Sequence, residues 1–227
     1  AIINDALYAY ELLSNDSKSQ LLNEKALLLG LLDEISRLNG IQVEVSTFET
    51  NYAYVLSLSV DTVNIDDLDS IESALATYDT LSADAKTQLA VEKTLLDSLF
   101  VEINRQIDIE SEITTFKTVY QETLVLTVYT ISTTDRSIVE NALAAYDLLS
   151  ADAKAQLTSE KALLDSLLVE IIRLEAIELE VSSFLSDHSV VLSLTTGTVL
   201  ASNQGIIDDA LAAYSLLTID AKVQLTT

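Results

Sequence analysis

One stretch of sequence recurs along this chain at a fixed spacing, and this repetition limits what the chain can fold into. The stretch, residues 138–168, reads IVENALAAYDLLSADAKAQLTSEKALLDSLL and is present in three full copies and one partial copy. Each copy lies 68 residues after the one before it. The spacing can be followed at three sets of positions: Tyr10, Tyr78, Tyr146 and Tyr214; Lys18, Lys86, Lys154 and Lys222; Ser14, Ser82, Ser150 and Thr218. A fixed period is typical of serial arrays in which each unit packs on its neighbours.

The predicted units are residues 1–67, 68–135 and 136–203, and residues 204–227 open a fourth unit with its first two helices. The chain contains no Pro and only four Gly, which favours long uninterrupted helices. Because 49% of the residues are hydrophobic, each unit can bury a core. We therefore predict an all-α, elongated serial array of 68-residue three-helix repeats, each with two short helices followed by one long helix.

The first helix of each unit is expected to begin at Asp67, Asp135 and Asn203, which are favourable N-cap residues. Its apolar positions follow helical spacing, and the repeated tyrosine falls among them. We interpret this tyrosine as a core ring whose hydroxyl lies at the rim of the core. The helix should end before Ser82 or Ser150.

The second helix is predicted to be short, about two turns, and capped by Ser82 or Ser150. Thr158 and Ser159 offer a cap for the third helix, with Glu160 in its first turn. The sequence leaves open whether the second and third helices run together.

The third helix is the long one, with an apolar stripe in steps of three or four residues. In the third unit this stripe runs from Leu164 to Val191, with one irregular step from Leu174 to Ile177. About 33 helical residues would give a rod of roughly 50 Å. The helix is expected to reach about Leu58, Leu126 and Leu194. A short strand at this end is the alternative, because these segments alternate and are rich in β-branched residues.

The stripe of the third helix is longer than its own unit can cover. We expect its second part, 177–194, to pack on the first helix of the next unit, 206–217. The alternative partner for the strip is another chain, which would produce a fibre by self-association.

Residues that could carry chemistry are few. His188 is the only histidine, and Tyr52 and Tyr120 stand at its equivalent positions, so we interpret it as a packing residue. Asp66, Asp67 and Asp69 lack the order of an EF-hand loop, although weak cation binding at such joints stays open. Gly197 and Gly205 do not form a phosphate-binding motif. The sequence therefore predicts no catalytic residue, no cofactor-binding residue, no metal ligand and no enzymatic activity.

The formal net charge of −24 disfavours contact with nucleic acid or anionic lipid. No apolar run approaches the roughly 18 residues that span a bilayer, so no membrane insertion is expected in this segment. The absence of Cys excludes disulfides and Cys-based zinc sites. Because the chain starts just before the first helix of a unit and ends in a second helix, we expect it to be a segment of a longer or processed polypeptide.

The string AL-x-AY-x-x-LS-x-x-AK-x-x-L-x-x-EK-x-LL-x-x-L, in residues 142–167 and their copies, resembles helical repeats of large bacterial surface proteins of Firmicutes and their wall-less relatives. The resemblance implies an extracellular or cell-surface stalk and carries no catalytic residue across. The expected function is a structural spacer or a filament-forming segment whose partners are neighbouring repeats. The alternative is a binding module that holds a glycan or a protein partner through its helix faces.

Overall fold

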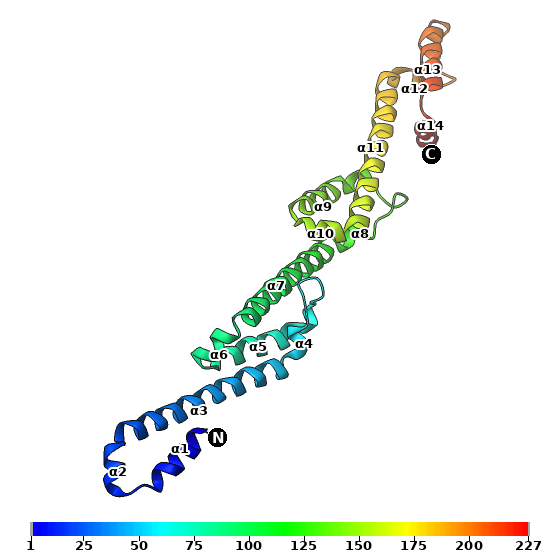
Figure 1. The fold of residues 1–227 in the computed structure, drawn as a ribbon. Helices are drawn as coiled ribbons and strands as arrows, with labels where there is room; N and C mark the ends of the chain where they lie inside the picture. The colour runs from blue at the N-terminus through cyan, green and yellow to red at the C-terminus, as the bar shows by residue number, and fades with distance from the viewer. Residues whose placement is uncertain (1, 227) are drawn as a thin grey trace. The chain divides into compact units, whose positions relative to one another are not determined.

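The computed structural model describes residues 2–226, and every regular element in this range is a helix (Figure 1). The prediction of an all-α fold is confirmed. The α-helices are α1 (Ile2–Glu11), α2 (Asn15–Gln20), α3 (Leu22–Asn51), α4 (Ala53–Leu56), α5 (Leu68–Thr80), α6 (Ala83–Gln88), α7 (Ala90–Val119), α8 (Gln121–Leu124), α9 (Arg136–Leu148), α10 (Ala151–Gln156), α11 (Thr158–Asp187), α12 (Ser189–Leu192), α13 (Gln204–Leu216) and α14 (Ile219–Leu225). Short 3-10 turns precede three of them: η1 (Ile65–Asp67), η2 (Thr133–Asp135) and η3 (Ala201–Asn203).

The chain divides into two compact units, residues 1–108 and 109–227, with the boundary inside α7. The four ranges expected from the sequence stay a prediction. Each compact unit contains one closed apolar core, and each is described by itself below.

The core of the first unit joins segments that are distant in sequence. The second half of α3 contributes Phe48, α5 contributes Ile71, and the first half of α7 contributes Leu96 and Leu99, all of them almost fully buried. Leu89, the single residue between α6 and α7, is also buried here. The second part of α3 is thus covered by α5 and α6, as expected from its apolar stripe, while its first part packs on α1.

The second unit has a core of the same kind. Phe116 of α7, Val139 of α9, Leu157, and Leu164 with Leu167 of α11 are buried together. The second half of α11 continues beyond this core and contacts α14, while α12 contacts α13. The phenyl ring of Phe184 meets the ring of Tyr214 edge-on, with 6.0 Å between ring centroids. The predicted packing of 177–194 on 206–217 is therefore seen in part, at Phe184 and at α12.

The serine caps of the second short helices are confirmed, and Thr218 makes the same contact in the last copy. Ser82 Oγ accepts from Ala85 N at 3.3 Å and Ser150 Oγ from Ala153 N at 3.2 Å. Thr218 Oγ1 accepts from Ala221 N at 3.3 Å. These contacts satisfy N–H groups that have no partner within the helix.

The expected N-cap role of Asp67, Asp135 and Asn203 is wrong in its detail, because none of their side chains caps the helix that follows. Each side chain reaches back three residues instead and accepts the N–H at the start of the preceding 3-10 turn. The distances are 3.0 Å from Asn64 N, 2.9 Å from Ser132 N and 2.8 Å from Leu200 N. The sequence pattern identified the right residues, but an extra turn of helix moves the cap upstream.

The second and third helices of each copy are separate. One non-helical residue divides them, Leu21, Leu89 or Leu157, and at Leu89 and Leu157 its side chain is buried. The cap expected at Thr158 or Ser159 is wrong, because α11 begins at Thr158 without a side-chain cap. Burial of the leucine fixes the break without a polar cap.

The long helices end earlier than predicted, and the alternative of a strand is wrong for residues 2–226. Each long helix has 30 residues and is broken at one position, Tyr52, Tyr120 or His188, before a further turn of helix. A lone strand would leave its backbone groups without partners. In the short helix α4 the N–H of Leu56 donates to the carbonyl of Tyr52 at 2.9 Å, and Val55 turns into the core.

Candidate functional site

The strongest candidates for functional contacts are the polar interactions at the turns between helices, because they recur in successive copies. The first of these, the tyrosine–lysine lock, joins the first short helix to the second. The hydroxyl of the repeated tyrosine donates to the backbone carbonyl oxygen of the lysine eight positions later. The distances are 3.1 Å for Tyr10 to Lys18, 3.0 Å for Tyr78 to Lys86 and 3.1 Å for Tyr146 to Lys154.

The side chain of the same lysine makes a second contact between the two short helices. Its ammonium group donates to a carbonyl oxygen at the end of the first helix, seven positions earlier. The acceptors are Glu11, Asp79, Asp147 and Ser215, at 2.8, 2.8, 2.7 and 2.8 Å. A cation is favourable at this end of a helix because the last carbonyl groups carry partial negative charge. The lock therefore fixes the turn with two hydrogen bonds in opposite directions.

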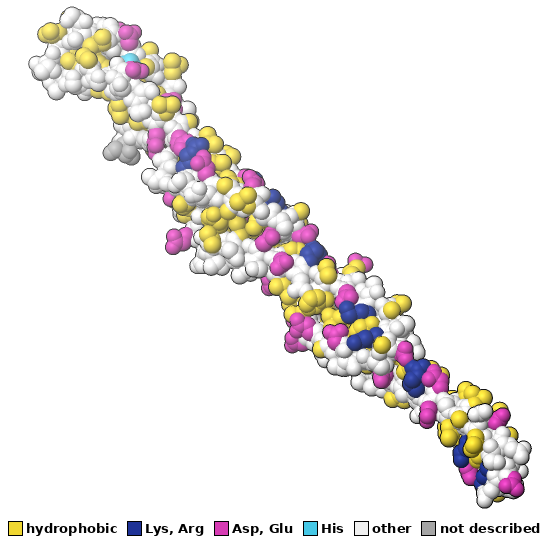
Figure 2. Space-filling view, turned by 90° about the vertical axis from the view of Figure 1, so that its left-hand side faces the viewer, with side chains coloured by type: hydrophobic (Ala, Val, Ile, Leu, Met, Phe, Trp, Pro, Cys, Tyr) yellow, Lys and Arg dark blue, Asp and Glu magenta, His cyan; other side chains and the backbone are white. Residues whose placement is uncertain are grey.

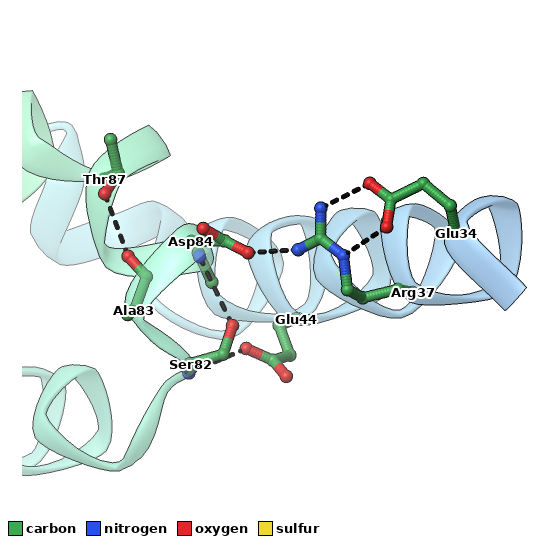
Figure 3. Close-up of polar contacts among 8 residues, drawn as sticks. Glu34, Arg37, Glu44, Ser82, Ala83, Asp84 and Thr87 are labelled. Carbon is green, nitrogen blue, oxygen red and sulfur yellow. Dashed lines mark hydrogen bonds and ion pairs between the residues drawn. The ribbon is translucent and has the colours of Figure 1, made fainter. Parts of the chain in front are cut away.

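A second recurring contact, the glutamate clamp, ties the second half of each long helix to the next short helix. Glu44 Oε2 accepts the N–H of Ser82 at 2.9 Å (Figure 3). Glu112 Oε2 accepts the N–H of Ser150 at 2.9 Å, and Glu180 Oε1 that of Thr218 at 2.7 Å. Because ionised carboxylates make stronger hydrogen bonds, these contacts with the cap residues lower the pKa of all three glutamates.

An arginine adds a second connection between the same elements. Arg37 forms an ion pair with Asp84 on α6 and is held in place by Glu34, as Figure 3 shows. Arg173 contacts Asp220 at 2.5 Å and Glu170 at 2.6 Å. These side chains are about half exposed, and exposed ion pairs typically contribute only about 0–1 kcal/mol. These ion pairs therefore orient the short helices on the long ones more than they stabilise the fold.

Sequence reasoning missed the clamp residues, although the signal was present. Glu44, Glu112 and Glu180 recur at the 68-residue period, as do Arg37, Arg105 and Arg173. A charged residue on a helix is usually solvated, so its recurrence does not by itself indicate a contact.

His188 lies at the C-cap of α11, where the long helix is broken. Its imidazole packs on the ring of Phe184 with 5.0 Å between centroids. Tyr52 and Tyr120 make the same contact with Phe48 and Phe116, at 5.0 and 5.2 Å. All three positions thus hold a ring against the phenylalanine four residues earlier.

The acidic group Asp66, Asp67 and Asp69 does not converge on one point. The buried carboxylate of Asp67 is used by Asn64 N and, at 2.8 Å, by the hydroxyl of Tyr54. The hydrogen bond to this carboxylate raises the pKa of Tyr54. Within residues 2–226, no three His, Cys, Asp or Glu side chains are placed together so as to hold a metal ion.

The two glycines considered for phosphate binding are in ordinary positions. Gly197 lies in the turn before η3 and Gly205 within α13, and neither has a positive φ.

Acidic side chains are spread between hydrophobic ones on the face drawn in Figure 2, and basic side chains are fewer. This matches the 36 acidic and 12 basic residues of the chain. Over residues 2–226, no helix is both long enough and apolar enough to be a candidate for a membrane span.

Comparison with protein-family models, with curated proteins and with solved structures found no match to this chain.

Proposed function

We propose that this chain is a structural spacer of an extracellular or cell-surface protein, built as a serial array of 68-residue three-helix units. The observation that supports this most directly is the recurrence of the lock and the clamp at the period of the sequence. Every polar group in these contacts is directed at another part of the same chain. A segment whose repeated polar residues hold its own helix turns in place is suited to keep the parts at its two ends apart and to transmit force between them.

The way in which the long helices are shared supports the same proposal. Within the second unit, α11 packs on α9 with its first half and meets α13 and α14 with its second half. The clamp residue Glu180 holds the cap of α14 from that second half. One continuous helix, α11, thus contributes to two successive contact regions of the second unit.

The extracellular location rests on the acidic composition and on the resemblance to bacterial surface repeats. Its test is surface labelling. Antibodies raised against this chain should bind intact cells of the source organism, and labelling only after permeabilisation would contradict the location.

The spacer role is tested by adding length. Leu167 and Phe184, one in each contact region of α11, are 17 residues apart, or about 25 Å along a helix. Insertion of a second copy of residues 136–203 should lengthen the particle by about 25 Å in small-angle X-ray scattering, and two copies by twice that. An unchanged maximum dimension would refute the array. A matched control inserts the same 68 residues in scrambled order.

The alternative, a binding module for a glycan or a protein partner, is favoured by one observation. Apolar side chains of α11 and α13, among them Leu185 and Leu211, stay exposed. Apolar surface suits a protein partner better than a glycan.

A further inference from the structure

A cleft of about 390 Å³ lies in the second unit where the long helix α7 is broken, beside α8 and the first turns of α9. Val119, the break residue Tyr120 and Thr123 of α8 line it, and α9 contributes Ile138 and Asn141. Its wall thus combines apolar side chains with hydroxyl and amide groups. Clefts of this size with a few polar groups among apolar ones are typical of sites for small ligands.

Thr123 is a buried residue whose hydroxyl has no partner in the protein. The residue is only 4% exposed, and its hydroxyl makes no hydrogen bond within residues 2–226. The hydroxyl oxygen is not enclosed, so the small exposed part of Thr123 opens to the cleft. Val55 and Val191 occupy the equivalent positions, and Val55 is buried in the core of the first unit. Packing alone is therefore satisfied by valine, and a largely buried hydroxyl without a partner indicates a ligand.

The hydroxyl of Tyr120 has also lost the partner that its counterpart has. In the first unit the hydroxyl of Tyr52 shares a hydrogen bond with Thr77 Oγ1 at 2.5 Å. Ala145 stands at the position of Thr77 in the second unit. Over the described range 2–226, the hydroxyl of Tyr120 makes no hydrogen bond. The same helix break is thus closed by side-chain contacts in the first unit and carries a free hydroxyl in the second.

The polar groups of the cleft select the class of ligand. The carboxylate of Glu122 and the amide of Asn141 line it and have no partner among residues 2–226. An anion is disfavoured by Glu122 and by the net charge of −24. An organic cation would pair with Glu122 but has no acceptor for the N–H groups of Asn141. Hydroxyl groups both donate and accept, so a neutral ligand rich in hydroxyls can satisfy the carboxylate, the amide and the protein hydroxyls together.

We propose that this cleft binds a neutral sugar residue of a glycan. Its hydroxyls bond to the hydroxyls of Tyr120 and Thr123, to Glu122 and to Asn141, while the C–H face of the sugar ring packs on Val119 and Ile138. The site gives the alternative function, binding, a place and a ligand class. It does not depend on the spacer role, because a spacer that binds no sugar would still lengthen when units are inserted.

Two substitutions test the site by removing one hydroxyl each. Thr123→Val installs the residue of the equivalent positions, and Tyr120→Phe keeps the ring that packs on Phe116 at 5.2 Å. The matched control is Thr114→Val, the same change at an exposed position of α7 that does not line the cleft. The melting temperature of all three variants should not fall measurably below that of the parent, so a change in binding reports on the cleft and not on folding.

Heteronuclear NMR of the nitrogen-labelled full chain, titrated separately with glucose, galactose, mannose and N-acetylglucosamine, measures binding. At least one of these sugars should shift the backbone amide signals of residues 118–123 and 138–141 and leave those of α5 and α6 unchanged. Thr123→Val and Tyr120→Phe should each weaken the affinity for that sugar about fivefold or more, the loss expected for one hydrogen bond. Thr114→Val should bind it like the parent.

A titration with choline separates the two ligand classes. Shifts of the same amide signals by choline and by none of the four sugars would overturn the proposal and indicate an organic cation held by Glu122. The absence of any shift at high millimolar sugar would also overturn it, as would a Thr123→Val variant that binds sugar as tightly as the parent. None of these results changes the outcome of the insertion test, so failure of the sugar site and failure of the spacer role can be told apart.

Discussion

Replacement of Tyr146 by phenylalanine and by alanine separates the two contributions of the tyrosine–lysine lock. The ring of Tyr146 is buried in the core of the second unit and meets Phe116 edge-on at 6.2 Å. Its hydroxyl donates to the carbonyl oxygen of Lys154 at 3.1 Å. The phenylalanine variant removes only the hydrogen bond, and the alanine variant removes the ring as well.

The expected losses of unfolding free energy differ enough between the two variants to be measured. A hydrogen bond of this kind typically contributes about 1 kcal/mol to the free energy of unfolding. Truncation of a buried aromatic side chain to alanine typically costs about 3–5 kcal/mol, because transfer energy is lost and a cavity remains. At about 4 °C per kcal/mol for a domain of this size, Tyr146→Phe should lower the Tm by about 4 °C and Tyr146→Ala by about 12–20 °C.

Urea unfolding followed by circular dichroism, combined with native-state hydrogen exchange, gives the assay. Hydrogen exchange is needed because units of an array can open separately, and the amides of α9 and α10 should lose protection first. Tyr129→Ala is the control, since the Tyr129 side chain is 94% exposed and its removal should change stability by less than about 0.5 kcal/mol. An alanine variant as stable as the phenylalanine variant would show that the ring is not part of the core.

Three further predictions concern the clamp, the cap and the ring of the helix break. Glu112→Gln should destabilise the chain at neutral pH. Because the pKa of Glu112 is lower in the folded state, the stability difference between parent and variant should be complete above the unfolded pKa near 4.5 and shrink as the pH falls through the folded pKa. Thermal melts across that pH range measure this difference. Ser150→Ala should cost about 1 kcal/mol in urea unfolding through loss of the cap, and a change below about 0.3 kcal/mol would contradict it. His188→Tyr should melt within about 0.5 kcal/mol of the parent, since Tyr52 and Tyr120 occupy the equivalent positions; loss of a binding activity with the fold intact would indicate a chemical role for the imidazole.

The apolar pattern of the sequence was enough to predict helices, their order and the buried face of the long helix. Tyr146, Leu164 and Leu167 were expected inside the core, and the structure buries all three. Such positions are predictable because burial of a large apolar side chain outweighs every local preference.

The capping and hydrogen-bonding details that sequence reasoning missed each involve about 1 kcal/mol. The serine caps were predicted correctly, whereas Asp67 caps one turn earlier than expected, since both arrangements satisfy the same number of N–H groups. The strand alternative arose because β-branched residues such as Val55 alternate near the end of the long helix. Val55 is buried within a single helical turn and needs no partner strand. Glu112 was missed because its acceptor role is visible only when the next short helix is in place.

The irregular step in the apolar stripe of α11 has a structural reason. At about 100° per residue, Leu164, Leu167, Ile171 and Leu174 point in one mean direction, and Ile177, Val181 and Phe184 point roughly 100° away from it. The slow drift of a seven-residue pattern around an α-helix, about 20° per heptad, accounts for less than half of this change. The first group packs on α9, and the second lies beside α13. The three-residue step from Leu174 to Ile177 therefore turns the apolar face from one contact region to the next. A regular heptad along the whole helix would keep both halves on one seam, as in a coiled coil, and could not serve two helix pairs in succession.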